Sequence, residues 1–461
     1  MVAIVIGGFA VSAAHGPRPS FGPPVDDEVQ VSNNDPRLAR AQNSPVLAAD
    51  PRDSDLVVLA SRLDAPRLNC ALHRSRNGGR RWEGVNPVPR LPPGADTCYA
   101  PEVAFGPSGQ LYYLFIGLHG RGNEPMGVFL TVSEDGGEHF GPPRQILGAN
   151  RFAVRMAIDN AMGRHGRIHL VWIEAGADPV LGGFQPVPNP ILAMHSDDGG
   201  TTFSAPVRVS SPTRPRAAAP ALAIGADHAV HVLYYDLGED ARDYQGLEGP
   251  TWEGHWALVL TTSGDGGVRF NAEVVVDDEV VPPERVMLIF TMPPPALAAN
   301  GAGALFAAWT DARSGDWDVL LRRSHHGGRS WDEAHRLNDD PLTNGRHQYL
   351  PRLGVAPDGR LDAIFYDRRG DAANLRHDVF YTFSRDEGRT FFPNDRLTTY
   401  RSDSRIGQRY LGPAAVGKVD LGSRLGLLSQ KTAVLAAWAD TRRARSSRSQ
   451  DVFAAQAKPS R

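Results

Sequence analysis

Short apolar runs bounded by Gly, Pro and Asp recur along the chain, and this pattern predicts β-strands rather than helices. In the clearest unit, a strand and its turn at 353–359 are followed by strands at 361–366, 378–383 and 394–398. Alternating or continuous apolar residues over such short stretches are typical of strands in stacked sheets. We therefore take a unit of four strands, A to D, as the building block of the chain.

The A and B strands of this unit recur seven times along the chain. The last set continues into a strand C at 451–456 but has no strand D, whereas 27–32 near the N-terminus has the pattern of an isolated strand D. An N-terminal strand that completes the last unit would close the sheets into a ring and remove their exposed edges. The pattern predicts an all-β, seven-bladed β-propeller of four-stranded antiparallel blades, with a six-bladed propeller plus an appended strand set as the alternative. The seven A and B sets lie at 46–59, 103–115, 156–172, 222–235, 297–309, 353–366 and 414–438.

A turn motif, Ser-x-Asp-x-Gly-x-x-(Trp/Phe), recurs at near-even spacing between the predicted strands C and D. The Asp or Asn can accept hydrogen bonds from backbone N–H groups of its own turn, and the glycines can adopt positive φ. The aromatic residue can pack back on the neighbouring strands. Such regular recurrence indicates a repeat architecture. Clean copies begin at Ser133, Ser196, Ser263 and Ser384, and altered copies begin at Ser75 and Ser324.

The motif resembles the Asp-box, or bacterial neuraminidase repeat, of the sialidase superfamily, and the resemblance covers nearly the whole chain. It implies an exo-α-sialidase-like propeller over residues 21–461 with its chemistry on the face opposite the boxes. The same box occurs in proteins with other activities or with none. It therefore bears more strongly on the fold than on the function.

A second repeated element is an acidic residue at the end of strand B, followed by Arg. A ring of such carboxylates and guanidinium groups could bind an acidic sugar through paired hydrogen bonds. Alternatively, repeated residues could do repeated structural work by tying each loop between strands B and C to its neighbour. The candidates are Asp311 and Asp367 as catalytic acids, and Arg313, Arg368, Asp440 and Arg442 as substrate-binding residues.

The loops between strands D and A offer less repetitive candidates, because strand A lines the central channel of a propeller. The sialidase resemblance implies a Tyr nucleophile paired with Glu, an Asp acid/base and three Arg residues that hold a carboxylate. Tyr410 fits the nucleophile because a neighbouring carboxylate can take the phenolic proton. The Arg-Ile-Pro-type motif is not found before the first box, so a third Arg of this kind is not assigned. Further candidates are Glu102 as a catalytic residue, and Arg155, Arg409, His347 and Trp252 as substrate-binding residues.

Composition narrows the possible partners. The chain has 461 residues and a formal net charge of −3, which favours neither nucleic acid nor an anionic membrane as a partner. After the N-terminus, no apolar run is long enough to span a bilayer. Metal-ligand spacings, phosphate-binding loops and nucleophile elbows are not recognised in the sequence. We expect a monomer with a carbohydrate ligand and without metal or cofactor.

Two features point to export. Residues 2–14 are apolar and end in small residues, which is typical of a secretory signal within 1–20, although no Lys or Arg precedes them. The alternative is a disordered tail. The two cysteines, Cys70 and Cys98, fall on the same rim of adjacent predicted blades, so we expect a disulfide rather than two free thiols.

Three functions are compatible with these residues. The first is a secreted glycoside hydrolase that acts on a terminal or acidic sugar. The second is a non-catalytic propeller that binds a glycan or a protein. The third is a polysaccharide lyase, for which His347 and Tyr349 would provide the base.

Overall fold

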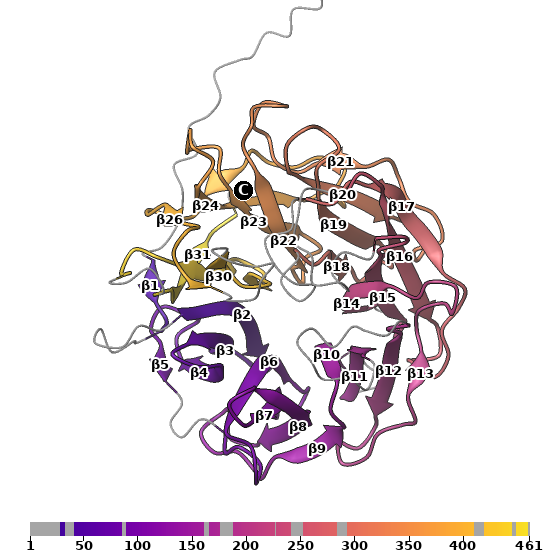
Figure 1. Cartoon of the computed structure of the whole chain (residues 1–461), viewed down its shortest axis with the longest axis vertical. Coiled ribbons are helices and arrows are strands. Elements are labelled where there is room, and N and C mark those ends of the chain that lie inside the picture. Colours follow the sequence, from indigo (N-terminus) through magenta and orange to yellow (C-terminus); the bar gives the residue numbers. More distant parts are fainter. Residues whose placement is uncertain are drawn as a thin grey trace, which may run out of the picture.

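The computed structural model describes residues 28–32, 41–84, 89–160, 166–175, 188–225, 227–240, 252–283, 293–409, 419–444 and 449–459. The predicted signal segment at 1–20 and Tyr410 lie outside the described residues, as does the side chain of Arg409. Within the described part, all regular elements are strands, and seven four-stranded antiparallel sheets surround a central axis as the blades of a β-propeller (Figure 1). The prediction of seven blades is confirmed, and the six-bladed alternative is excluded. The described residues contain no helix that could cross a membrane.

The blades follow one another in chain order. Blade 1 holds β2 (Ala41–Asp50), β3 (Asp53–Ala65), β4 (Asn69–Ser75) and β5 (Glu83–Gly84), and blade 2 holds β6 (Thr97–Phe105), β7 (Leu111–His119), β8 (Glu124–Ser133) and β9 (Arg144–Leu147). Blade 3 holds β10 (Arg151–Asp159), β11 (Arg167–Glu174), β12 (Ile191–Ser196) and β13 (Val207–Arg208), and blade 4 holds β14 (Ala217–Ile224), β15 (Val230–Asp236), β16 (Trp256–Ser263) and β17 (Val274–Val280).

The remaining blades complete the ring. Blade 5 holds β18 (Ala296–Ala299), β19 (Leu305–Asp311), β20 (Asp318–Ser324) and β21 (His335–Arg336), and blade 6 holds β22 (Gln348–Val355), β23 (Leu361–Asp367), β24 (Arg376–Ser384) and β25 (Asp395–Arg396). Blade 7 holds β29 (Gly426–Ser429), β30 (Val434–Asp440), β31 (Asp451–Ala457) and β1 (Val29–Gln30). β26 (Ser402–Asp403) pairs with β24, and β27 (Gln408–Arg409) pairs with β28 (Val419–Asp420). The first strand of blade 7 begins at Gly426, later than the predicted set at 414–438.

The N-terminal strand closes the ring as the sequence predicts. β1 pairs antiparallel with β31, and the two lie side by side where the indigo and yellow ends of the chain meet in Figure 1. Val31 continues the pairing, since its backbone N–H donates to the Val452 carbonyl at 2.9 Å. The Ser32 hydroxyl donates to Asp451 at 2.9 Å. Pairing of two segments from opposite ends of the chain removes the free edges that an open stack of sheets would leave.

The six repeated turns join strands C and D of blades 1 to 6 and share one hydrogen bond. In each, the Ser hydroxyl accepts the backbone N–H of the Gly four residues later at 2.8–2.9 Å. In the turn of blade 2, Asp135 also accepts from the Ser133 hydroxyl at 2.7 Å and from the His139 backbone at 2.9 Å. The altered copy at Ser324 keeps the Ser–Gly bond although His326 replaces the Asp.

The second glycine of the turn is needed for packing as well as for conformation. Gly79 has φ 94°, and a Cβ on it would lie 2.7 Å from Leu435 of blade 7. Gly200 has φ 78°, and a Cβ there would lie 2.6 Å from Leu130 of blade 2. A side chain at either position would therefore clash with the preceding blade. The turn of blade 1 packs on blade 7 in the same way as the turn of blade 3 packs on blade 2, which continues the repeat across the closure.

A β-bulge interrupts the innermost strand of five blades. The pairing of strand A with strand B shifts register in blades 1, 2, 3, 4 and 6. At each shift a non-glycine residue adopts positive φ, between 49° and 57°, which costs about 1 kcal/mol or more and persists only where the surroundings enforce it. Bulges bend a strand and redirect the side chains beside them. The positive-φ residues are Ser44, Ala100, Ala153, Ala219 and Leu350.

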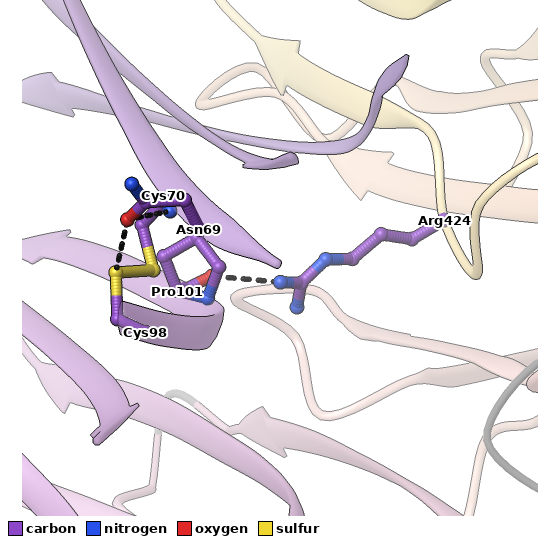
Figure 2. The surroundings of a disulfide bond; sticks show 5 residues. All are labelled: Asn69, Cys70, Cys98, Pro101 and Arg424. Carbon is purple, nitrogen blue, oxygen red and sulfur yellow. Dashed lines mark hydrogen bonds between the residues drawn. A yellow bond between two sulfur atoms is a disulfide. The ribbon is translucent and has the colours of Figure 1, made fainter. Parts of the chain in front are cut away.

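The predicted disulfide is confirmed. Cys70 at the start of β4 and Cys98 in β6 are bonded, with Cα atoms 5.7 Å apart, and so link blade 1 to blade 2. Both half-cystines are buried in the apolar cluster that these blades share. Figure 2 shows that the bond lies close in the chain to Pro101, whose carbonyl accepts a hydrogen bond from Arg424 of blade 7 at 2.7 Å. Blades 1, 2 and 7 are thus connected near the channel by a covalent bond and a polar contact.

Candidate functional site

The bulges direct a set of charged side chains into the central channel. Two residues after the positive-φ position, blades 2, 3 and 6 carry Glu102, Arg155 and Arg352, and all three line one axial pocket. Arg424, which precedes β29 in blade 7, completes the charged set. The same pocket is lined by residues of all seven blades, most of them apolar or proline. Strand A of the fold therefore supplies a charged cluster in an otherwise apolar channel.

Glu102 is the centre of the cluster. Arg155 Nη1 lies 3.2 Å from Glu102 Oε1, and Arg424 Nη1 forms a salt bridge with the same oxygen. Arg424 also donates to the carbonyl of Pro101 (Figure 2). Its Nε donates to the carbonyl of Ser44 at 3.3 Å. The Arg352 side chain makes no hydrogen bond or salt bridge to the described residues, although the nearby charge of Glu102 acts to raise its pKa. The Glu102 carboxylate thus pairs with two of the three guanidinium groups.

The cluster carries an excess of two positive charges in a desolvated place. Desolvation, followed by repulsion from Arg424, lowers the pKa of Arg155 to about 10. Desolvation by the surrounding blades also lowers the pKa of Arg352, although its side chain is exposed to the channel. The direction of these shifts means that the pocket disfavours its own cations, and an anion would relieve this. The cavity at this point is small, with a volume of about 70 Å³.

The acidic residues at the ends of the B strands do not line the axial pocket, and they share one pattern of contacts with the loops that follow them. Asp311, Asp367 and Asp440 are almost fully buried, and each accepts the backbone N–H of the residue two positions later at 2.6–2.8 Å. Each also forms a salt bridge with the Arg at that later position, at 2.7–2.8 Å. In blade 6 this partner is Arg369, not the predicted Arg368. These contacts tie the loop between strands B and C to its own strand.

The arginines of these pairs have further partners among the outer strands. Arg313 also bonds Asp277 of blade 4 at 2.7 Å, and Arg442 forms a salt bridge with Glu28 beside the closing strand at 2.5 Å. Two of the acids accept the indole N–H of a Trp two positions before them, at 2.8 Å for Trp309 and 3.2 Å for Trp438. The repeated acid–Arg element therefore has the contacts that a structural interpretation expects.

The remaining predicted binding residues pack against aromatic and core groups and do not line the axial pocket. Arg368 lies 5.0 Å from the ring centroid of Tyr349 and donates to the Ser404 hydroxyl at 3.0 Å. His347 stacks on Trp317 with centroids 4.4 Å apart, and desolvation lowers its pKa to about 4. Trp252 is partly buried against the core of blade 4.

The charge state of Asp367 should govern part of the pH dependence of stability. Desolvation, opposed by Arg369, raises the pKa of Asp367 to about 6, above its ordinary value of 3.8. The folded state then binds the proton more tightly, so this group stabilises the fold below pH 3.8 and loses that contribution as the pH rises through 6. Two pKa units correspond to roughly 3 kcal/mol.

We expect Asp367→Asn to remove this slope. Unfolding in urea at a series of pH values from 4 to 7 measures it, and the comparison uses the change of the unfolding free energy with pH rather than its absolute value. An unchanged slope in Asp367→Asn would show that Asp367 has an ordinary pKa in the folded protein.

Sequence reasoning missed Arg352 and Arg424, and it placed Glu102 and Arg155 at the beginnings of strands that in fact start earlier. The missing signal is a proline inside an apolar strand A, which marks a bulge because proline cannot donate to the sheet. Pro101 precedes Glu102, and Pro351 precedes Arg352. Arg424 has no such signal, since only the closure of the ring brings blade 7 against blade 2.

A tyrosine–carboxylate pair is present but is not suited to act as a nucleophile. Tyr234 donates a hydrogen bond to Glu273, which also pairs with Arg214 at 2.8 Å. Tyr234 is fully buried. Burial first, and then the Glu273 charge, raise the pKa of Tyr234 well above its ordinary value. A nucleophilic phenol needs access and an activating base, so this pair supports the packing of blade 4 instead.

Comparisons with known proteins agree with the fold. Residues 290–403, about a quarter of the chain, match the model of a BNR repeat-containing family member. A crystal structure of a protein of unknown function from Dyadobacter fermentans superimposes with a TM-score of 0.50 at 13% identity, covering 94% of this chain and 98% of that one. No curated protein matches the sequence significantly.

Two enzymes are among the other structures that this chain resembles. The intramolecular trans-sialidase of Ruminococcus gnavus has a TM-score of 0.47 at 12% identity, with 76% of this chain and 95% of that chain covered. The α-L-arabinanase of Penicillium chrysogenum has a TM-score of 0.44 at 12% identity, with coverages of 79% and 95%. The repeat match and the seven-bladed architecture together indicate a β-propeller with BNR-type repeats.

Proposed function

We propose that this protein is an exported, sialidase-like glycoside hydrolase that acts on a terminal or acidic sugar of a glycan. The observation that carries the proposal is the excess of three guanidinium groups over one carboxylate in a pocket to which every blade contributes. Such a cluster favours an anionic group of the substrate, because guanidinium pairs with carboxylate in a defined geometry. Residues 21–461 would form the single hydrolase domain, and the six repeated turns would be its Asp-boxes.

The size of the pocket sets how a sugar could bind. Pockets for ligands of drug size have volumes of roughly 300–1,000 Å³. The axial cavity, with about 70 Å³, has room for a carboxylate group but not for a sugar ring. In the proposed complex the carboxylate enters the cavity while the ring remains at the mouth of the channel. We place the mouth on the face opposite the repeated turns.

Roles follow for the channel residues. Arg155, Arg352 and Arg424 would bind the substrate anion, and Glu102 would hold two of these guanidinium groups in position. Glycoside hydrolysis also needs an acid and a nucleophile or base. Tyr410 is the proposed nucleophile. Asp367 is not the acid in this proposal, because it is fully buried in its salt bridge with Arg369 and does not line the axial pocket. The Cys70–Cys98 disulfide supports a location outside the reducing cytoplasm.

A glycan-library screen with mass analysis of the products tests this function. If the wild type cleaves a glycan, we expect Arg352→Gln to lower kcat/KM by roughly 100-fold, because a desolvated charged contact to the substrate is lost. Arg329→Gln is the matched control, since Arg329 is an exposed arginine in the turn of blade 5. Equal activity of the two variants would remove the axial pocket from the proposal.

A non-catalytic function is the second candidate, and one observation favours it. The narrow cavity suits the capture of an anionic group better than the enclosure of a reacting sugar. Binding of an acidic glycan without any product in the same screen would select this alternative, and an unsaturated uronate product would select the lyase.

A further inference from the structure

The axial pocket carries an excess of positive charge even when no glycan is bound. Arg155, Arg352 and Arg424 face one carboxylate, and the charges of Arg424 and Arg352 both lower the pKa of Arg155. Arg155 and Arg424 are partly buried and have the Glu102 carboxylate as a charged partner, whereas the Arg352 side chain is exposed to the channel. Arg352 has no such partner among the described residues. The described side chains therefore do not neutralise the positive charge of the pocket.

The geometry of the cluster is fixed by the backbone. Arg424 is held by the carbonyl of Pro101 (Figure 2) and also by Glu102 and the carbonyl of Ser44. Ser44 is itself a positive-φ bulge residue, and the bulge of blade 2 lies directly before Pro101. A ligand that binds here would not have to order these side chains, and binding to a preorganised site costs less conformational entropy.

The pocket favours a small ligand, and the rest of its wall is apolar. Its volume of about 70 Å³ is roughly twice the share of one water molecule in the liquid, about 30 Å³. Apolar side chains of strand A complete the wall and exclude competing water dipoles, which strengthens attraction between an anion and guanidinium groups. These wall residues include Val46, Leu47, Ala221, Leu222 and Leu297.

We propose that, when no glycan is bound, the axial pocket binds one small inorganic anion that contacts Arg352 and at least one of Arg155 and Arg424. The anion neutralises part of the excess charge and connects blade 6 to blade 3, to blade 7 or to both at the centre of the ring. It acts as a structural ligand of the propeller. This inference concerns the free protein and does not depend on glycan cleavage, so it stands or falls separately from the proposed function.

The test measures thermal unfolding at constant ionic strength. Sodium bis(trifluoromethylsulfonyl)imide serves as the background salt, because this bulky anion has no small charged end that could enter the cavity, and it is replaced stepwise by sodium chloride or by sodium phosphate. A ligand that binds only the folded state raises Tm with its concentration. We expect a rise of Tm with chloride, phosphate or both in the wild type and in Arg329→Gln, and a loss of most of that rise in Arg352→Gln.

The outcomes separate the ligand from general salt effects. A rise with chloride alone identifies a halide site, and a rise with phosphate alone identifies an oxyanion site. Equal behaviour of all salts in the wild type overturns the proposal, as does an equal rise in Arg352→Gln and Arg329→Gln. If Arg352→Gln does not fold, wild-type crystals soaked in bromide give a second test through anomalous scattering. A bromide peak beside Arg352 then supports a halide site; no peak, together with no chloride or phosphate effect on the wild type, overturns the proposal.

Discussion

Val31→Asp is expected to lower the unfolding free energy by about 3–5 kcal/mol, because it places an unpaired charge where the ring closes. Val31 is 2% exposed and packs in the cluster shared by blades 1 and 7. Its neighbours there include Val57 of blade 1 and Leu435 of blade 7. Loss of this contact also weakens the pairing of β1 with β31 and so exposes the edge of the last blade. Chemical denaturation followed by circular dichroism measures the change.

The matched control for ring closure is Val268→Asp. Val268 lies in the turn of blade 4 and is 46% exposed, so the same substitution there leaves the carboxylate in water. We expect a change within about 0.5 kcal/mol for the control. If Val31→Asp is as stable as Val268→Asp, the N-terminal strand does not hold the ring closed in solution.

Acid should unfold the protein mainly through its buried histidines. Desolvation lowers the pKa of His73, His169 and His231 from 6.5 to about 4. The unfolded chain therefore binds more protons than the folded one between pH 6.5 and 4, and stability present above pH 6.5 is lost as the pH falls through this window. Each such histidine contributes roughly 3 kcal/mol. The sign is opposite to that of Asp367, and several histidines outweigh one aspartate.

His73→Leu tests this origin, because neither ring nitrogen of His73 has a hydrogen-bond partner in the structure. We expect the variant to lose less stability than the wild type between pH 6.5 and 4, as measured by denaturation at fixed pH steps. His255→Leu, at an exposed position, should leave the slope unchanged. Identical slopes in His73→Leu and the wild type would mean that His73 is protonated in the folded state.

The number and order of the blades could be predicted because each depends on local sequence. The apolar runs give the strands, and the Ser and Gly residues of the turns form their hydrogen bonds within five residues, as from Gly137 to Ser133. The disulfide followed from the same register, since both cysteines fall on adjacent blades at one rim. Ring closure could be predicted because the last blade has no strand D of its own, while an isolated strand near the N-terminus can supply it.

The candidate site was less accessible to sequence reasoning. The repeated acids Asp311, Asp367 and Asp440 attracted attention because they recur, yet their oxygens bond the loops that follow them. Glu102 and Arg155 could be nominated from their place on strand A. Arg352 and Arg424 could not be nominated in this way, because they come from blades 6 and 7. Only ring closure brings these blades to the same pocket as Glu102.

By itself the sequence determined a closed propeller of seven blades. The alternation of apolar residues in the strands, the residues of the turns and the division of the last blade between the two ends of the chain can each be read from short segments. Only the tertiary structure decided which charges meet at the axis. Bulges at positive-φ residues turn Glu102, Arg155 and Arg352 inward, and closure brings Arg424 across from the last blade. The physical reason is that a charge cluster depends on distances between segments far apart in the chain, which no local pattern encodes.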